Sequence, residues 1–437
     1  MARLASMGRA LAHRNYRLYV MGQSISLIGT WMQQVGLTWL VYRLTGSPFL
    51  LGFVAFASQI PTFFVSPIAG VLGDRWNRHR TLKVTQTVAM IQSSALVLLM
   101  WTGQIEVWLI LVLSVVLGLV NAFDMPTRQA FLVEMVPRRE DLPNAIALNS
   151  SMVNAARLVG PTIAGMLIAV GGEIACFSFN AVSYLAVLIA LTQMRDLPER
   201  PRPVTGRVWR GVAEGFSYAF GFEPIRALLL SPGMVSLMGM PLSVLLPIFA
   251  TDILKGGPSL LGFLIGASGI GALTAALYLA SRGTVLGLGR QMALATGVFG
   301  AGMIAFASSR SIPLSLGILV VTGFCMMLQM AAANTLLQTI VDEDKRGRVM
   351  SLYTMAFMGT APIGSLLAGL IANNFSAPLA LEIGGATCIV GSLLFARKLP
   401  SLREQVRPIY QRAGILPEVA IAVETSAELH TPPEESP

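Results

Sequence analysis

The densest group of charges in this 437-residue chain is the stretch 70–80, Gly-Val-Leu-Gly-Asp-Arg-Trp-Asn-Arg-His-Arg. Its single carboxylate, Asp74, is followed by Arg75, Arg78 and Arg80. The runs on either side, 44–73 and 84–105, contain no Lys, Arg, Asp or Glu. Because about 20 apolar residues span a bilayer as a helix, the stretch is predicted to be a tight hydrophilic turn between two transmembrane helices. Asp74 can there meet helix ends and neighbouring cations; the simpler alternative is a set of cations that only orients the protein.

Arg157 is the second candidate for chemistry. It lies about 13 residues into the predicted helix 144–168, which is about 20 Å along the axis and near the middle of a membrane. A cation there costs ~3 kcal/mol or more unless it faces a polar cavity or a partner. We expect Arg157, with Asn154 one turn earlier on the same face, to line an aqueous cleft and bind an anionic or electron-rich substrate group or a coupling carboxylate. The alternative is a packing role between helices.

Other polar residues within apolar runs are candidates to line the same cleft. They are Gln33 and Gln34 on the predicted helix 18–42, and Gln329 and Asn334 among Met residues on the predicted helix 312–337. Met side chains suit adaptable pockets. Glu382 lies about one turn into the last predicted helix, and no carboxylate sits unmistakably at mid-membrane depth.

The composition places the chain in the membrane class, with 54% apolar and 12% charged residues. Its net charge of +9 is distributed over short loops, so we expect no nucleic-acid partner. Three Cys and three His are scattered without paired or metal-ligand spacing, so no disulfide, metal or cofactor is expected.

An ATP-driven pump is excluded because no Gly-x-x-x-x-Gly-Lys loop exists. A membrane acyl or prenyl transferase would need His or paired carboxylates near the interface at metal or acid/base spacing. The sequence has no such group, so we expect no enzyme.

Charge-free runs and turn residues predict an all-α integral membrane protein with twelve transmembrane helices. The predicted spans are 18–42, 48–73, 82–102, 105–125, 144–168, 174–193, 225–251, 258–281, 290–308, 312–337, 349–372 and 378–397. With both termini in the cytoplasm, the inner segments hold 27 of the 31 Lys and Arg residues. The outer loops hold Arg43, Lys255 and Arg310, and Arg157 is the remaining one. This bias satisfies the positive-inside rule.

A Pro- and Arg-rich linker halfway along the chain predicts two pseudo-symmetric six-helix bundles. We divide the chain into a cytoplasmic segment 1–17, bundles 18–193 and 225–397 joined by the linker 194–224, and a cytoplasmic tail 398–437. The tail is expected to be disordered, because beyond Gly414 it carries five Glu and no Lys or Arg. Pro161 and Pro362 occupy corresponding places in the two bundles.

The spacing Gly-x-Leu-x-Asp-Arg-x-x-Arg-x-Arg resembles the loop between helices 2 and 3 of the major facilitator superfamily of secondary transporters. Asn77 departs from it, standing where the family usually has Gly, and Asn also tolerates a positive φ. The motifs Gly29-Thr-Trp-Met-Gln-Gln34 and Pro126-Thr-Arg-Gln-Ala130 look like the enterobactin-exporter and macrolide-efflux branch, as does Arg157-Leu-Val-Gly-Pro161.

The resemblance implies the major facilitator fold and roles for several residues. It implies that Asp124 pairs with Arg78 and joins Asp74 and the nearby Arg128 in a charge relay that gates the cytoplasmic side. Gly160 and Pro161, with Gly165 one turn on, resemble a helix-5 signature of exporters, and their alternative role is helix packing. Proton antiport is also implied, but three carboxylates stay candidates for the carrier, in the order Asp124, Asp74 and Glu382.

We therefore expect a monomeric secondary transporter of the cytoplasmic (inner) membrane. It would export a drug- or siderophore-like small molecule by alternating access, with protons as the coupling ion and the lipid bilayer as its surroundings. A lysophospholipid flippase-like carrier is the alternative within the same fold. A membrane protein without transport activity is the other alternative, because fold alone does not establish function.

Overall fold

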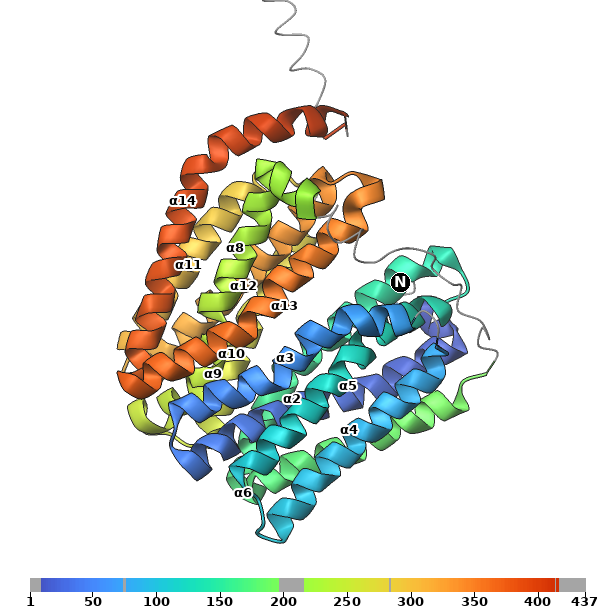
Figure 1. Cartoon of the computed structure of the whole chain (residues 1–437), viewed down its shortest axis with the longest axis vertical. Helices are drawn as coiled ribbons and strands as arrows, with labels where there is room; N and C mark the ends of the chain where they lie inside the picture. The colour runs from blue at the N-terminus through green and yellow to red at the C-terminus, as the bar shows by residue number, and fades with distance from the viewer. Residues whose placement is uncertain (1–8, 74–75, 196–215, 283, 413, 416–437) are drawn as a thin grey trace, which may run out of the picture.

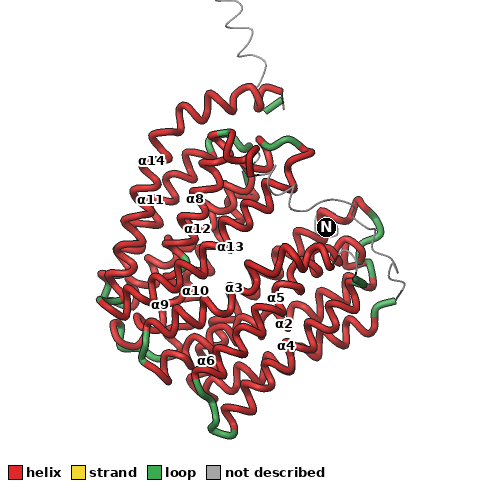
Figure 2. The backbone as a smooth tube through the Cα atoms, viewed as in Figure 1, coloured by secondary structure: helices red, strands yellow, loops and turns green. Residues whose placement is uncertain are grey.

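A computed structural model describes residues 9–73, 76–195, 216–282, 284–412 and 414–415. In these residues every regular element is a helix, as Figure 2 shows. The first half of the chain contains η1 (Arg9–Ala12), α2 (Arg14–Thr45), α3 (Pro48–Gly73), α4 (Arg78–Trp101), α5 (Val107–Glu134), η2 (Arg139–Asp141) and α6 (Leu142–Gln193). The second half contains α8 (Glu223–Gly239), α9 (Pro241–Ile248), the π-helical η3 (Phe249–Ile253), α10 (Pro258–Ala280), α11 (Leu288–Ser308), α12 (Ile312–Ile340), α13 (Glu343–Asn374) and α14 (Ala377–Arg412).

The described helices make twelve membrane crossings, six in each half, and form the two-bundle fold that the sequence predicts. Ten helical spans are long and apolar enough to cross a membrane. One of them, α6, contains two crossings, because Gly172 at φ 69° breaks the helix where the sequence places a loop. The twelfth crossing is α2, whose 32 residues are long enough to span a membrane but contain no stretch as apolar as those of the ten, because glutamines interrupt it. The elements α8, α9 and η3 together make one crossing.

The end of the last helix differs from the prediction. The last helix was expected to end at residue 397, but α14 continues to Arg412, so residues 398–412 are helical rather than part of a disordered tail. Leu402 and Val406 in this extension are buried against the second half, and that apolar contact explains why the helix continues. The remaining tail, 416–437, lies outside the described residues, as does 196–215 of the linker.

Asn77 begins α4 by capping it rather than by adopting a positive φ. Its φ is −69°, and its side-chain oxygen accepts a hydrogen bond from the Arg80 backbone N–H at 3.0 Å. This is the ordinary role of Asn at a helix N-cap. The neighbouring Asp74 and Arg75 lie outside the described residues, so the expected gate at Asp74 stays a prediction.

The two halves share an apolar core at one end only. Around Leu40 and Leu51 of the first half, the core is continuous with Leu246 and Leu261 of the second half. At the opposite end each half has its own separate core. Figure 1 shows the same arrangement, because the two groups of helices converge at the end that holds α9 and diverge towards the end marked N.

Glycines make the convergence possible. A Cβ on Gly165 of α6 would lie 2.7 Å from the Pro258 carbonyl oxygen, and a Cβ on Gly262 of α10 would lie 2.7 Å from the Pro161 carbonyl oxygen. Between α3 and α13, a Cβ on Gly369 would lie 2.8 Å from the Pro48 oxygen. These separations are shorter than real Cβ contacts, so the helices can cross here only because the residues have no side chain.

We predict that Gly262→Leu separates the converged ends of the two halves. The added side chain has no room, and overpacking of this kind costs ~1–3 kcal/mol, enough to shift a two-state balance by about tenfold. The measurement is crosslinking of Ser47→Cys to Asn373→Cys, whose native side chains lie 3.5 Å apart across the halves. The matched control is Gly317→Leu, since nothing lies within 4 Å of a Cβ there. Unchanged crosslinking in Gly262→Leu would contradict the prediction.

Candidate functional site

A cavity of about 130 Å³ lies between the two halves. Helices α2, α3 and α6 of the first half and α9, α10 and α12 of the second half line it. Most of its walls are apolar, and its polar side chains are Gln34, Thr38, Ser58, Arg157, Ser243 and Ser268. A concave, mostly apolar site with a few polar groups is typical of small-molecule binding. Its position between the halves means that their relative movement changes its shape.

Arg157 brings a positive charge into this cavity. Its guanidinium carbon lies 5.7 Å from the ring centroid of Trp31 on α2, within the range of a cation–π contact. It makes no ion pair or hydrogen bond with any other described residue. The structure thus brings Arg157 to the cleft, as the sequence suggests. Without a carboxylate partner here, it is available to an anionic or aromatic ligand.

The Gly160–Pro161 signature fixes the place of Arg157 relative to Trp31. A Cβ on Gly160 would lie 2.6 Å from the Trp31 Cβ, so only Gly lets α6 come this close to α2 at that level. The next turns, at Pro161 and Gly165, contact α10 across the two halves. Pro362, the counterpart of Pro161, is buried within α13. These residues therefore serve packing as well as the placing of Arg157.

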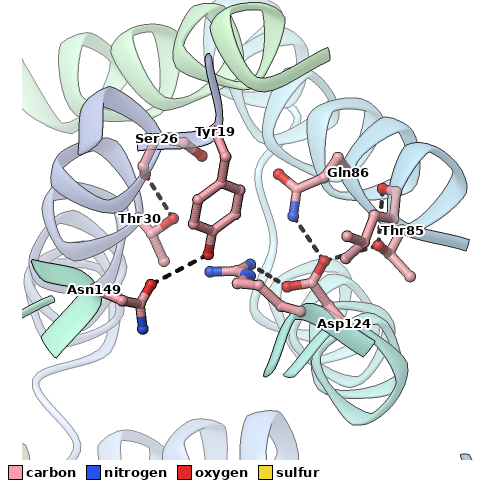
Figure 3. Close-up of polar contacts among 9 residues, drawn as sticks. Tyr19, Ser26, Thr30, Thr85, Gln86, Asp124 and Asn149 are labelled. Carbon is pink, nitrogen blue, oxygen red and sulfur yellow. Dashed lines mark hydrogen bonds and ion pairs between the residues drawn. The ribbon is translucent and has the colours of Figure 1, made fainter. Parts of the chain in front are cut away.

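A second polar group lies inside the first half, around Asp124 of α5 (Figure 3). Asp124 is 1% exposed. Its Oδ1 accepts hydrogen bonds from Thr85 Oγ1 and Gln86 Nε2 of α4, both at 2.8 Å. Its Oδ2 forms an ion pair with Arg128, one turn further along α5. Every described interaction of this carboxylate is thus inside the first half.

Tyr19 belongs to the same group. It points from α2 into the space that Asp124 enters from α5, and its hydroxyl donates to Asn149 Oδ1 at 3.3 Å (Figure 3). Its hydrogen bond joins α2 to α6 beside the Asp124 network, which joins α4 to α5. The Gln86 Oε1 and Arg128 Nε atoms in it are buried and have no hydrogen-bond partner. Spare donors and acceptors of this kind allow the network to rearrange when the charge at its centre changes.

The expected pair between Asp124 and Arg78 is wrong. Arg78 Nη1 lies 2.7 Å from Glu134 Oε1 and bonds the Ala130 carbonyl oxygen at 3.4 Å. Glu134 is ten residues beyond Asp124 on α5, about 15 Å along the helix, and lies level with the start of α4. Arg78 therefore meets the acid at its own depth, and Asp124 takes Arg128 instead.

The glutamines expected to line the cleft separate into two kinds. Gln34 lines the cavity, whereas Gln33 is buried inside the first half. The Gln33 amide donates to Gln92 at 3.0 Å, and its oxygen accepts from Ser93 at 2.7 Å and from Asn180 at 2.8 Å. Gln33 thus connects α2, α4 and α6 and does not face the cavity.

The other candidates lie away from the cavity. Gln329 is fully buried and donates to Ser231 Oγ at 3.2 Å, and Asn334 accepts from Gln338. Asn154 donates to the Ser150 carbonyl oxygen at 2.9 Å. Glu382 is partly buried near the start of α14, at the converged end of the molecule.

The sequence did not suggest the contact that closes the converged end. The Tyr42 hydroxyl at the end of α2 bonds the Asp252 carboxylate in η3, and this hydrogen bond crosses between the halves. Beside it, Arg43 Nε lies 2.6 Å from Glu173 Oε1, an ion pair within the first half. Tyr42 and Asp252 are 210 residues apart, so no local spacing could have revealed their contact. The only signal was that Asp252 directly follows the predicted helix 225–251.

Comparison with known proteins agrees with this architecture. The sequence model of the family described as transmembrane secretion effector matches residues 6–427. The chain is 24% identical to the staphyloferrin A transporter of Staphylococcus aureus over 370 residues, which cover 84% of this chain and 92% of that protein. It is 27% identical to the multidrug efflux pump Tap of Mycolicibacterium fortuitum over 348 residues, which cover 78% and 84%.

Solved structures show the same fold. A bacterial homologue of the iron transporter ferroportin, in an inward-facing state, matches with a TM-score of 0.68 and 18% sequence identity. The match covers 88% of this chain and 98% of that one. At this identity the likeness concerns the arrangement of helices.

We predict that Asp124→Asn destabilises the protein because it leaves the Arg128 guanidinium without its counter-charge. Breaking a buried ion pair costs ~3–5 kcal/mol, and removing both charges costs less. The midpoint temperature of thermal unfolding, measured on the detergent-solubilised protein, should therefore fall most for Asp124→Asn. It should recover in the double variant Asp124→Asn with Arg128→Gln. Glu134→Gln is the matched control, since its ion pair is partly exposed and contributes only about 1 kcal/mol. Equal loss in the single and double variants would contradict the ion-pair account.

Proposed function

Because the chain belongs to the transmembrane secretion effector family of the major facilitator superfamily, we propose that it exports a drug- or siderophore-like small molecule by alternating access. The observation that carries this proposal is the unpaired Arg157 in the cavity between two halves that converge at one end only. A binding site between two bodies that can rock is what alternating access requires. The names of the staphyloferrin A transporter and the efflux pump Tap agree with such substrates.

The diverged end is proposed to face the cytoplasm. The start of η1, the start of α13 and the end of α14 all lie there (Figure 1). The segments that the sequence predicts to lie on the inner side carry 27 of the 31 Lys and Arg residues. The positive-inside rule then places this end in the cytoplasm and the Tyr42–Asp252 contact outside. The conformation would be the one that accepts substrate from the cell.

The cavity favours a substrate with a negative or electron-rich group. The charge of Arg157 is placed against the Trp31 ring and a largely apolar wall, so an aromatic or aliphatic body can pack while one anionic group meets the guanidinium. Carboxylates of a siderophore-like molecule satisfy this pattern. A purely cationic drug does not, because it would bring a like charge next to Arg157.

Opening to the outside would require the converged contacts to separate. Those contacts are close helix crossings at glycine and three hydrogen bonds, Tyr42 to Asp252, Ser47 to Asn373 and Ser259 to the Gly165 carbonyl oxygen. Van der Waals contact between helices in lipid is favourable but modest. The packed contact between the halves can therefore move from one end of the molecule to the other without breaking a buried ion pair. While Asp124 is ionised, the ion pairs of the first half, including Asp124–Arg128, would move with it as one body.

Proton entry is proposed to drive the cycle through Asp124. This carboxylate is buried, and its neighbours in the network have spare hydrogen-bonding capacity. Protonation would remove the charge that holds Arg128, so the guanidinium and the Gln86 amide would re-pair and the first half would change shape. Glu382 is less suited, since it is only partly buried and has no hydrogen-bond or ion-pair partner among the described residues.

We predict that Arg157→Ala lowers export of an anionic substrate by about tenfold to a hundredfold, because it removes one charge-assisted contact of ~1.5–3 kcal/mol. Arg157→Lys should retain part of the activity. The measurement is efflux of a hydroxycarboxylate siderophore, with ethidium as the cationic comparison, from cells that lack their own pumps. Arg310→Ala is the charge-matched control, because Arg310 is exposed in the loop between α11 and α12 and does not line the cavity. If Arg157→Ala leaves the dependence of export on substrate concentration unchanged, Arg157 serves helix packing and not substrate binding.

We also predict that Asp124→Asn separates transport from the proton gradient. In proteoliposomes the variant should exchange substrate down its concentration gradient but no longer accumulate it when a pH gradient is imposed. Glu382→Gln should stay coupled. Loss of coupling in Glu382→Gln, with Asp124→Asn still driven by pH, would move the carrier to α14.

A further inference from the structure

A second cavity, of about 470 Å³, lies within the second half and apart from the site between the halves. It lies beneath the extension of α14, at the diverged end of the molecule. Its walls include Leu228 of α8, Leu336 of α12, and Phe395 and Leu402 of α14. None of these residues lines the cavity that holds Arg157. The proposed export function therefore leaves this cavity unexplained.

The depth of the cavity is that of the lipid headgroups. The extension from Leu399 to Tyr410 begins about 33 Å along α14 from Ala377 and ends about 50 Å along it. The hydrocarbon core of a bilayer is about 30 Å thick, so this part of the helix runs at and beyond its edge. Pro400 lies at the start of the extension, and Figure 1 shows α14 turning over the end of the second half.

The extension is amphipathic, with one apolar face and one cationic edge. Leu402 and Val406 are buried towards the second half, whereas Arg403 and Arg407 are exposed one turn apart and also line the cavity. Residues 397–412 carry five Lys or Arg and one Glu, Glu404, which lies between the two arginines. Basic amphipathic helices of this kind lie in the interface and attract anionic lipids.

The two arginines have no partner among the described residues. Neither Arg403 nor Arg407 forms an ion pair or hydrogen bond there, whereas the nearby Lys398 lies 2.8 Å from Glu223. Two free guanidinium groups one helical turn apart suit a phosphate, which accepts several charge-assisted hydrogen bonds. The apolar hollow beside them has the volume for part of an acyl chain.

We propose that this cavity binds an anionic phospholipid of the leaflet at the diverged end, with the phosphate on Arg403 and Arg407 and an acyl chain inside the hollow. Such a lipid would hold the α14 extension against α8, α12 and the loop before α11. The proposal does not depend on the exported substrate or on proton coupling.

The test is native mass spectrometry of the full chain in detergent with dioleoyl phosphatidylglycerol. We expect lipid adducts on the wild-type chain and a roughly tenfold or greater loss of affinity in Arg403→Ala with Arg407→Ala, since each cation near a membrane surface adds about 1 kcal/mol. The matched control is Arg397→Ala with Arg412→Ala, which removes the same charge from the same helix outside the cavity. Val406→Trp, which fills the hollow, should also lose adducts while the protein stays monodisperse.

Several results would overturn the proposal. Equal adduct formation by the Arg403/Arg407 variant and its control would remove the arginines from the site. Equal binding of dioleoyl phosphatidylcholine would mean that the hollow accepts any amphiphile. Competition by glycerol phosphate at the affinity of the full lipid would identify a free-anion site that does not use the hollow. A dimer that dissociates in the Arg403/Arg407 variant would assign the surface to a second copy of the chain.

Discussion

A hydrocarbon interior tolerates an ionised side chain only where another group compensates its charge, and the charged residues of this protein follow two different solutions. Asp124 is compensated inside the first half by Arg128, Thr85 and Gln86. Arg157 is compensated by no described residue and lies instead at the boundary of the two halves, beside Trp31. The first solution makes one bundle internally complete. The second leaves a requirement that only water or a ligand in the cleft can meet.

This division of charge explains why the contact between the halves can be reversible. Where the halves converge they meet through glycine crossings, apolar side chains and a few hydrogen bonds, among them Tyr42 to Asp252 and Ser47 to Asn373. The described ion pairs join residues of the same half, so separating the halves exposes no broken pair. Packing in lipid gains little from apolar burial, so the free-energy difference between two such arrangements is small. A bound substrate or proton could therefore shift the equilibrium between them.

The sequence predicted the helices well because membrane crossing is a constraint along one dimension. Charge-free runs and the Lys and Arg bias placed twelve crossings in two halves, and even the break near Gly172 was expected. The bias could not predict that α14 continues to Arg412, since that depends on an apolar face packing against the rest of the second half.

Pair contacts were predicted poorly because they depend on depth and rotation along two helices at once. Arg78 pairs with Glu134 and not Asp124 because the acids differ by about 15 Å in depth. Gln33 and Gln34 are adjacent in sequence, yet about 100° of rotation sends one into a buried network and the other into the cavity. Arg157 lines the cavity between the halves, where the sequence suggested a cleft, because a single charge in an apolar helix has few alternatives.

The two halves are alike in fold but differ in the residue at the depth of Asp124. Asp124 stands 17 residues after the start of α5, and Gln329 stands 17 residues after the start of α12, the helix in the corresponding place of the second half. Gln329 is also buried, but it is neutral and bonds only the Ser231 hydroxyl. The first half therefore carries an ionisable group at this depth, whereas the second half carries a neutral one. This asymmetry supports the proposed cycle, in which the first half would respond to protonation while the second half supplies an uncharged wall of the cavity that Arg157 lines.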